Sequence, residues 1–253
     1  ENKGDTMNRI TEPQIIYEDT DIIVCRKPAG LPTQTSRVGC RDLVSILKNH
    51  LAEEKRNHAN SSPEKGGRSS RQNQSGPYLA VIHRLDQPVD GLLVFAKTAA
   101  AARELNRQLT GSSFGKYYRA VVHGIPDPPE GTLEDYLIKD GRTNTSRVCP
   151  ETTPGARPAR LHYRVIKTVT RADSVTSLVE IHLDTGRHHQ IRVQMAHLGC
   201  PLAGDRKYGR PSASEIPAAQ GTPKPLMLCA FRLEFRHPRT GRKMQFELPE
   251  EFS

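Results

Sequence analysis

The alternation of hydrophobic and polar residues is clearest between residues 78 and 98, which read YLAVIHRLDQPVDGLLVFAKT. Apolar runs at 79–85 and 92–96 flank a short polar break that contains Pro88 and Gly91. This pattern predicts two antiparallel strands joined by a tight loop of about five residues.

Arg84 and Asp86 are expected to share a face near the end of the first of these strands, because side chains alternate between the two faces of a strand. An ionised carboxylate held beside a cation is a candidate reactive group there, since loops at strand ends commonly carry catalytic residues. The alternative is a surface ion pair that contributes little to stability. The spacing alone does not decide between the two.

Apolar residues at helical spacing predict two helices, over 42–51 and over 99–109, the second ending near Gly111. Residues 52–77 contain almost no apolar side chains and are rich in Ser, Asn, Gly and Pro, which predicts a mobile insertion. A second such insertion is predicted at 210–225. The first insertion carries basic residues that either contact phosphate groups or stay solvated: Lys55, Arg56, Lys65, Arg68 and Arg71.

The segment 116–124 is predicted to be a strand with Tyr118 and Ala120 on one face. A tyrosine in such a place is ordinarily a packing residue. Residues 126–155 are predicted to be a loop-rich, basic stretch.

Two further strands are predicted at 159–168 and 177–183. The second runs into DTGRHHQIR at 184–192, after which apolar residues at helical spacing predict a helix capped by Gly199. The local structure is therefore strand, glycine turn, helix.

Short β-like runs at 15–25 and an alternating strand at 226–235, followed by a hairpin turn at 237–241, complete the pattern. The chain lacks the regular helix–strand alternation of a parallel α/β sheet. We therefore expect an α+β domain over 15–250, built on a mixed, mostly antiparallel sheet with flanking helices, after an N-terminal extension at 1–14.

Composition and charge restrict the partners. Lys and Arg total 37 of 253 residues against 28 Asp and Glu, which gives a net charge of +9 and favours a polyanionic partner such as nucleic acid. Mean hydropathy is −0.62, and no apolar run approaches the roughly 20 residues that span a bilayer. Five cysteines show no Cys-x-x-Cys spacing, so neither a zinc site nor a disulfide framework is indicated and a reducing cytoplasm is expected.

Several motifs resemble, in order, those of the RluA family of RNA pseudouridine synthases. The central one is His-Arg-Leu-Asp at 83–86. Lys-Pro-x-Gly at 27–30 precedes it. Lys-x-Tyr-x-Ala at 116–120, Thr-Gly-Arg-x-His-Gln-Ile-Arg at 185–192 and the block at 199–209 follow it. The matches extend over nearly the whole chain.

The resemblance implies a pseudouridine synthase fold with a central catalytic cleft, and conversion of uridine in RNA to pseudouridine without a cofactor. In the family, the aspartate at the position of Asp86 is catalytic and acts as nucleophile or base at the ribose. The resemblance implies that Arg192 pairs with Asp86 and lowers its pKa, and that Tyr118 stacks on the base or helps to move its proton.

A uridine in folded RNA has to be extruded before it can react, and the resemblance implies that Arg84 fills the vacated space. The expected partner is structured RNA, ribosomal or transfer, and the protein is expected to be a cytoplasmic monomer that uses no metal. The N-terminal RNA-binding domain of many relatives is expected to be absent, because Lys27 stands close to the start. The implied RNA- or base-binding residues are Arg84, Arg187, His189, Gln190 and Ile191.

Two positions depart from the family pattern. Val89-Asp90-Gly91 stands where Thr-Ser-Gly is usual, which adds a carboxylate that raises the pKa of Asp86 unless Asp90 faces away. His188 stands where Thr is common. Both departures bear on rate and pH optimum.

Three alternatives remain open from the sequence. A catalytically inactive RNA-binding protein of the same fold would have the same charge, and a nucleoside hydrolase using Asp86 would release free base. A metal-dependent hydrolase lacks the usual ligand spacing. Its candidate ligands are His182, His188, His189 and His197.

Overall fold

The structure is a computed structural model that describes residues 12–37, 39–60, 76–111, 113–172, 174–209 and 225–249. Most of the predicted N-terminal extension lies outside the described residues, as do the greater parts of the two predicted insertions, 61–75 and 210–224.

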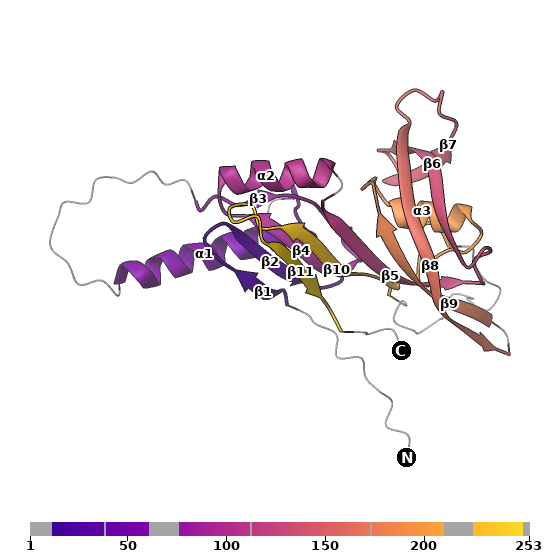
Figure 1. Ribbon diagram of the computed structural model, residues 1–253, viewed down its shortest axis with the longest axis horizontal. Coiled ribbons are helices and arrows are strands. Elements are labelled where there is room, and N and C mark those ends of the chain that lie inside the picture. The colour runs from indigo at the N-terminus through magenta and orange to yellow at the C-terminus, as the bar shows by residue number, and fades with distance from the viewer. Residues whose placement is uncertain are drawn as a thin grey trace, which may run out of the picture.

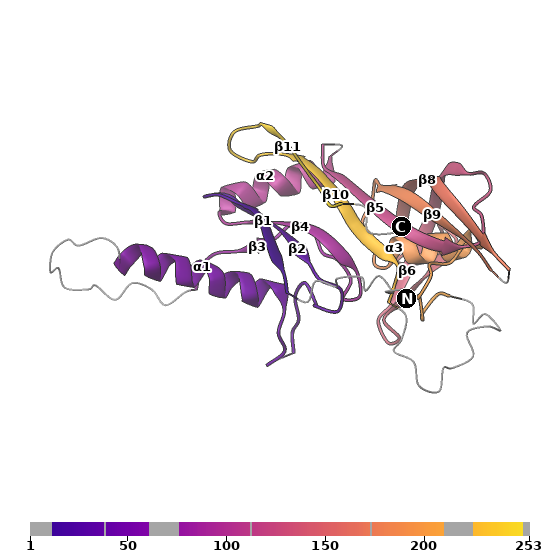
Figure 2. The ribbon, with the colours of Figure 1, turned by 90° about the horizontal axis from the view of Figure 1, so that it is seen from below.

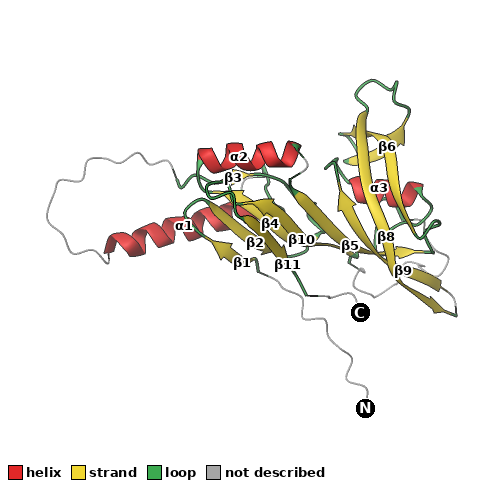
Figure 3. Ribbon diagram, viewed as in Figure 1, coloured by secondary structure: helices red, strands yellow, loops and turns green. Residues whose placement is uncertain are grey.

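Within these ranges the chain forms one sheet of 11 strands with three helices packed on it (Figure 1; Figure 3). Strands follow the order β1-β2-β4-β10-β5-β9-β8-β6-β7, with β11 on β10 and β3 on β4. The β4–β10 pair is parallel and the other pairs are antiparallel, which confirms the predicted α+β fold. The elements are β1 (Gln14–Glu18), β2 (Ile22–Lys27), α1 (Leu43–Asn60), β3 (Ala80–Val81), β4 (Asp90–Ala96), α2 (Ala99–Thr110), β5 (Gly115–His123), β6 (Glu130–Asp140), β7 (Thr145–Cys149), β8 (Arg157–Arg171), β9 (Ser174–Leu183), α3 (Gln190–His197), β10 (Leu228–Arg236) and β11 (Lys243–Glu247).

Two large hydrophobic cores cover the two faces of the sheet, and a smaller third cluster joins α3 to β6 and β8. Leu47 of α1, Tyr118 of β5 and Met195 of α3 belong to one core, whereas Leu105 of α2 and Phe231 of β10 belong to the other. Figure 2 shows α1 and α2 flanking the β1–β4 end of the sheet, and α3 beside β6, β8 and β9. Because α1 and α3 share a face but cover different ends of it, the centre of that face stays open between them.

Several predicted elements are confirmed. The predicted helix at 99–109 is α2, and Oγ1 of Thr98 accepts a hydrogen bond from the backbone N of Ala101 at 3.1 Å as its N-cap. Tyr118 and Ala120 are both buried on one face of β5. The predicted hairpin at the C-terminal end is the antiparallel β10–β11 pair.

The predicted hairpin at 79–96 is wrong in its first strand. Only Ala80 and Val81 pair with β4, opposite Ala96 and Phe95. Further pairing along this edge is blocked because β10 already pairs with the start of β4 at Asp90. Beyond Val81 the chain leaves the sheet, and the expected alternation of faces is lost.

Two loop predictions are also wrong. The helix predicted at 42–51 continues to Asn60, because the first residues of the supposed insertion, AEEKRN, are mostly good helix formers. The stretch at 126–155 contains β6 and β7, which pair with each other and extend the sheet beyond β8. No helix in the described ranges is both long and apolar enough to cross a bilayer.

Gly91 is required where β4 meets β10. A Cβ at this position, whose φ is +136°, lies only 2.5 Å from the backbone N and O of Ala230. We expect Gly91→Ala to lower the free energy of unfolding by about 3 kcal/mol or more, through overpacking and backbone strain together. Gly241→Ala is the matched control, because Gly241 has φ +70° but open space around it; strain alone should cost about 1 kcal/mol there. Equal losses in urea denaturation would contradict the close approach at Ala230.

Candidate active site

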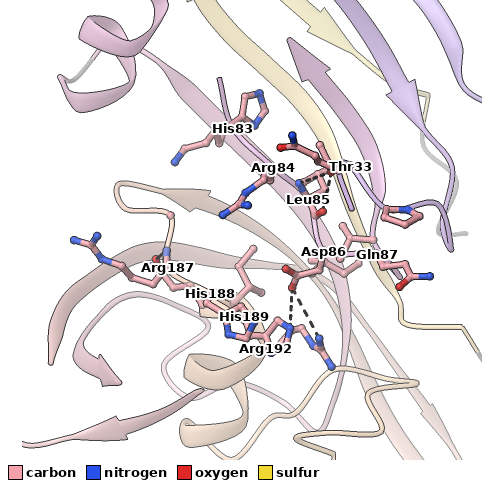
Figure 4. A pocket seen from close by; sticks show the side chains of 18 of the residues that line it. Thr33, His83, Arg84, Leu85, Asp86, Gln87, Arg187, His188, His189 and Arg192 are labelled. Carbon is pink, nitrogen blue, oxygen red and sulfur yellow. Dashed lines mark hydrogen bonds and ion pairs between the residues drawn. The ribbon is translucent and has the colours of Figure 1, made fainter. Parts of the chain in front are cut away.

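A cleft of about 1250 Å³ opens between the segment that precedes α1 and the start of α3, and is called the central cleft below. The turn after β2, the segment before β4, the end of β9 and the start of α3 contribute to its walls (Figure 4). Its lining brings together the predicted residues Arg84, Asp86, Tyr118, Arg187 and Arg192. Pockets for small ligands usually measure about 300–1000 Å³, so this cleft has room for a nucleotide with part of its neighbours.

The segment that carries Asp86 is fixed by a neighbouring turn. Thr33 Oγ1 donates to the carbonyl of Leu85 at 2.9 Å and accepts from its backbone N at 3.3 Å. The backbone N of Gly30 donates to the carbonyl of Gln87 at 2.8 Å. These bonds replace the strand pairing that the sequence predicts and hold the aspartate at the edge of the cleft.

The Asp86 carboxylate faces two basic side chains (Figure 4). Its Oδ2 lies 3.6 Å from Nε2 of His189 and 3.9 Å from Nη1 of Arg192. Burial raises the pKa of Asp86 above its ordinary value, although Arg192 and Lys27 pull this pKa down. The expected lowering by Arg192 therefore exists, but burial outweighs it.

Arg192 binds most closely to a second carboxylate. Its Nε and Nη2 donate to Asp205 at 2.8 and 2.7 Å, and the Asp205 side chain is fully buried. Asp205 also accepts hydrogen bonds from the backbone N of Lys207 and of Tyr208. Arg192 is thus held in a bidentate pair with Asp205, and its Nη1 faces Asp86.

His189 joins Asp86 to Tyr208. Its Nδ1 lies 2.7 Å from the Tyr208 hydroxyl, which itself accepts a hydrogen bond from the backbone N of Ser146 at 2.7 Å. Burial and the nearby Arg192 lower the pKa of His189 to about 3, so the ring is neutral. If the Tyr208 hydroxyl donates to Nδ1, the ring proton sits on Nε2 and faces Asp86.

His189 also precedes α3 with a left-handed backbone, φ +56°. A non-glycine residue in this conformation is strained, and such strain is found at functional sites where the surrounding structure enforces it.

Tyr118 lies on the sheet floor of the cleft. Burial first, and the Asp86 charge second, raise the pKa of its phenol well above the usual range. The phenol therefore keeps its proton at neutral pH, which suits packing against a base or donating a hydrogen bond, and it cannot serve as a phenolate base.

The other predicted binding residues differ in how accessible their side chains are to a ligand in the cleft. Arg84 is exposed at the cleft, and Arg187 also lines it. Nε of Arg187 donates to the carbonyl of Pro158 at 2.8 Å. Gln190 is buried and its amide bridges Thr185 and the carbonyl of Arg160, whereas Ile191 is part of the core. These last two side chains hold the loop that presents Arg187.

The family model described as RNA pseudouridylate synthase matches residues 21–197. The chain belongs to this family. It is 35% identical to the dual-specificity RNA pseudouridine synthase RluA of Escherichia coli strain K12, over 94% of this chain and 93% of that protein. It is 33% identical over 93% of its length to ribosomal large subunit pseudouridine synthase D of Nitrosomonas europaea, of which it spans 61%. The solved human RNA pseudouridylate synthase domain containing 4 shares the fold, with TM-score 0.70, 21% identity and coverage of 93% and 87%.

The structure accounts for both departures from the pattern of this pseudouridylate synthase family. Asp90 is bound by Arg26 through two hydrogen bonds of 2.9 and 2.8 Å, and the carboxylate that raises the pKa of Asp86 is instead Asp205. His188 Nδ1 lies 2.9 Å from Ser146 Oγ and its ring stacks on His189 with centroids 3.7 Å apart. His188 therefore ties the start of β7 to the loop that carries His189.

The four histidines of the metal-hydrolase alternative do not converge. Among the described residues, groups of ligand atoms close enough to share an ion include only His182 of the four, together with His162 and Asp184. His188 and His189 stack on each other, and His197 lies near Asp135.

The sequence interpretation missed Lys27, Asp205 and Tyr208 as parts of this site. Lys27 is fully buried and its Nζ donates to three backbone carbonyls around the Asp86 segment, those of Pro28, Leu31 and Gln87. The signal for Asp205 and Tyr208 was present in the family-like block at 199–209. Nothing in the sequence pairs that block with residue 86 or 192, so the sequence does not assign it to the site.

Proposed function

We propose that this protein isomerises uridine to pseudouridine in structured RNA, ribosomal or transfer, with Asp86 as its catalytic residue. The observation that supports this most is the Asp86 carboxylate, held between His189 and Arg192 in a large cationic cleft. Residues 15–250 act in this proposal as one catalytic domain, in the cytoplasm and as a monomer. The family and its named relatives supply the reaction class.

The chemistry breaks the bond between N1 of uracil and C1′ of the ribose, turns the base and joins its C5 to C1′. C5 then loses its proton and N1 gains one, so the net reaction is an isomerisation. Asp86 reacts at the ribose as nucleophile or base, and the reaction needs neither redox change nor cofactor. Arg192 and Lys27 offset the negative charge on Asp86, and the neutral His189 lies beside the carboxylate. Tyr118 packs beside the detached base, and the buried floor of the cleft keeps water from the reactive sugar.

The test is conversion of unmodified structured RNA by the purified protein. We expect pseudouridine at one or a few uridines, with no added metal or nucleotide and no free uracil. Release of uracil would instead support a nucleoside hydrolase, and tight RNA binding without product would support an inactive RNA-binding protein. Loss of activity with a chelator, while the RNA stays folded, would contradict a mechanism without metal.

A further inference from the structure

Lys116 of β5 lines the central cleft, and its ammonium group has no hydrogen-bond or ion-pair partner among the described residues. It lies two residues before Tyr118 on the same buried face of the strand, and it lines the cleft that contains Asp86. The residue is only 8% exposed. Within the described part of the chain, no hydrogen bond or ion pair to its Nζ is present.

The other buried lysine shows what a structural role looks like. Lys27 is fully buried, and its Nζ donates to three backbone carbonyls at 2.7 to 3.1 Å. All three donor positions of that ammonium are therefore used by the protein. Lys116 has no such set among the described residues, and its Nζ reaches the surface of the cleft. Its acceptors therefore come from water or from a ligand that enters the cleft.

The surroundings of Lys116 favour an anion. Arg187 lies near enough to repel its charge, and Arg84 lines the same cleft. The carboxylate that attracts it, Asp184, is shared with Nε of Arg160 at 3.2 Å and Nε2 of His162 at 2.9 Å. Excess positive charge at this wall suits a phosphate, whereas a neutral uracil oxygen would leave it uncompensated.

The wall also provides space for a ligand at Lys116. A Cβ added at Gly186 would lie 3.3 Å from Nζ of Lys116, so the absence of a side chain at Gly186 keeps the ammonium accessible. Nδ1 of His83, whose ring also lines the cleft, is buried and has no hydrogen-bond partner among the described residues.

We propose that Lys116 binds a backbone phosphate of the RNA next to the target uridine, and so positions that nucleotide against Asp86. The proposal rests on the proposed function for the identity of the RNA substrate. It assigns the pocket two chemically different walls, one that reacts with the ribose and one that holds the phosphate.

The test is a chemical double-mutant cycle. The probe is a synthetic RNA stem-loop with uridines in the loop, made with single neutral methylphosphonate linkages at successive loop positions. In the wild-type protein we expect one linkage to weaken binding about tenfold, the size of one charge-assisted contact. Lys116→Met should weaken binding of the unmodified RNA by a similar factor. In this variant, the same neutral linkage should cause no further loss of affinity. The slope of log Kd against log salt concentration should be smaller by about 0.7 in Lys116→Met than in the wild-type protein.

Two further variants make the result specific. Lys116→Arg retains the charge and should keep most of the salt dependence, whereas Lys243→Met removes an exposed charge on β11 and should leave every linkage effect unchanged. Lys116→Met should melt at or above the wild-type temperature, since it removes a largely desolvated charge that has no partner among the described residues. A large drop in melting temperature would indicate a structural lysine.

Equal linkage effects in wild type and Lys116→Met would overturn the proposal. So would weaker binding with an unchanged salt dependence, which would place Lys116 on a uracil oxygen. Because the cycle uses dissociation constants, it is independent of turnover. Absence of pseudouridine would reject the proposed function without deciding the role of Lys116.

Discussion

Asp86→Asn is expected to abolish pseudouridine formation while leaving RNA affinity within about twofold of wild type, since the amide keeps the shape of the carboxyl but cannot act as nucleophile or base. The variant should also be at least as stable as wild type at neutral pH. Burial raises the pKa of Asp86, so the folded protein holds this proton more tightly than the unfolded chain does. Ionised Asp86 therefore costs stability above its folded pKa, and the neutral amide removes that cost.

The measurements are single-turnover conversion, RNA binding and thermal melting of both proteins at the same pH. Glu in place of Asp86 is the matched control, because it keeps the charge but moves it by one methylene. Turnover by Asp86→Asn above about 1% of the wild-type rate would contradict the assignment. A marked loss of stability would show that the carboxylate holds its loop in place.

Arg192→Ala and Arg84→Ala should affect stability and reaction rate in different ways. Losing Arg192 leaves the fully buried Asp205 carboxylate without its cation, and breaking such a pair typically costs about 3–5 kcal/mol of folding stability. It also removes the cation nearest Asp86, so the rate should fall on every RNA. Arg84 is exposed and forms no such pair with any described residue, so Arg84→Ala should change stability by less than about 0.5 kcal/mol.

The effect of Arg84→Ala should depend on the substrate instead. If Arg84 fills the space left by an extruded uridine, the rate penalty should be large on folded RNA and small on a short unstructured RNA, where extrusion costs less. Single-turnover rates on both RNAs, with urea denaturation of each variant, test this.

The double variant Arg192→Ala/Asp205→Ala is the control for the pair. It removes both charges, so it should be more stable than Arg192→Ala alone. Equal penalties for Arg84→Ala on both RNAs would reject its role in extrusion. Wild-type stability of Arg192→Ala would show that Asp205 finds another partner.

The local pattern of the sequence was enough to locate most elements and the order of the motifs. Period-two alternation identified β5 and β9, and helical spacing identified α2, because each buries one face against a single core. The family resemblance added Asp86, Tyr118 and Arg192, which lie far apart in the chain and meet at one cleft.

Tertiary structure decided what local pattern cannot encode. The strand before Asp86 ends after Val81 because β10, from the far end of the chain, occupies the edge of β4 that a hairpin needs. Contacts between residues far apart in the sequence also determine which charged side chains form ion pairs. Arg192 is shared between Asp205 and Asp86, and Asp90 is bound by Arg26.

The two buried lysines show the same limit of prediction from the sequence. Lys27 and Lys116 both lie in family-like motifs, and nothing in their neighbours along the chain distinguishes them. The fold surrounds the first with carbonyls from a neighbouring turn and leaves the second facing an open cleft. Sequence determined which residue types are present, and only the packing of distant segments decided which charges are satisfied within the protein and which remain for a ligand.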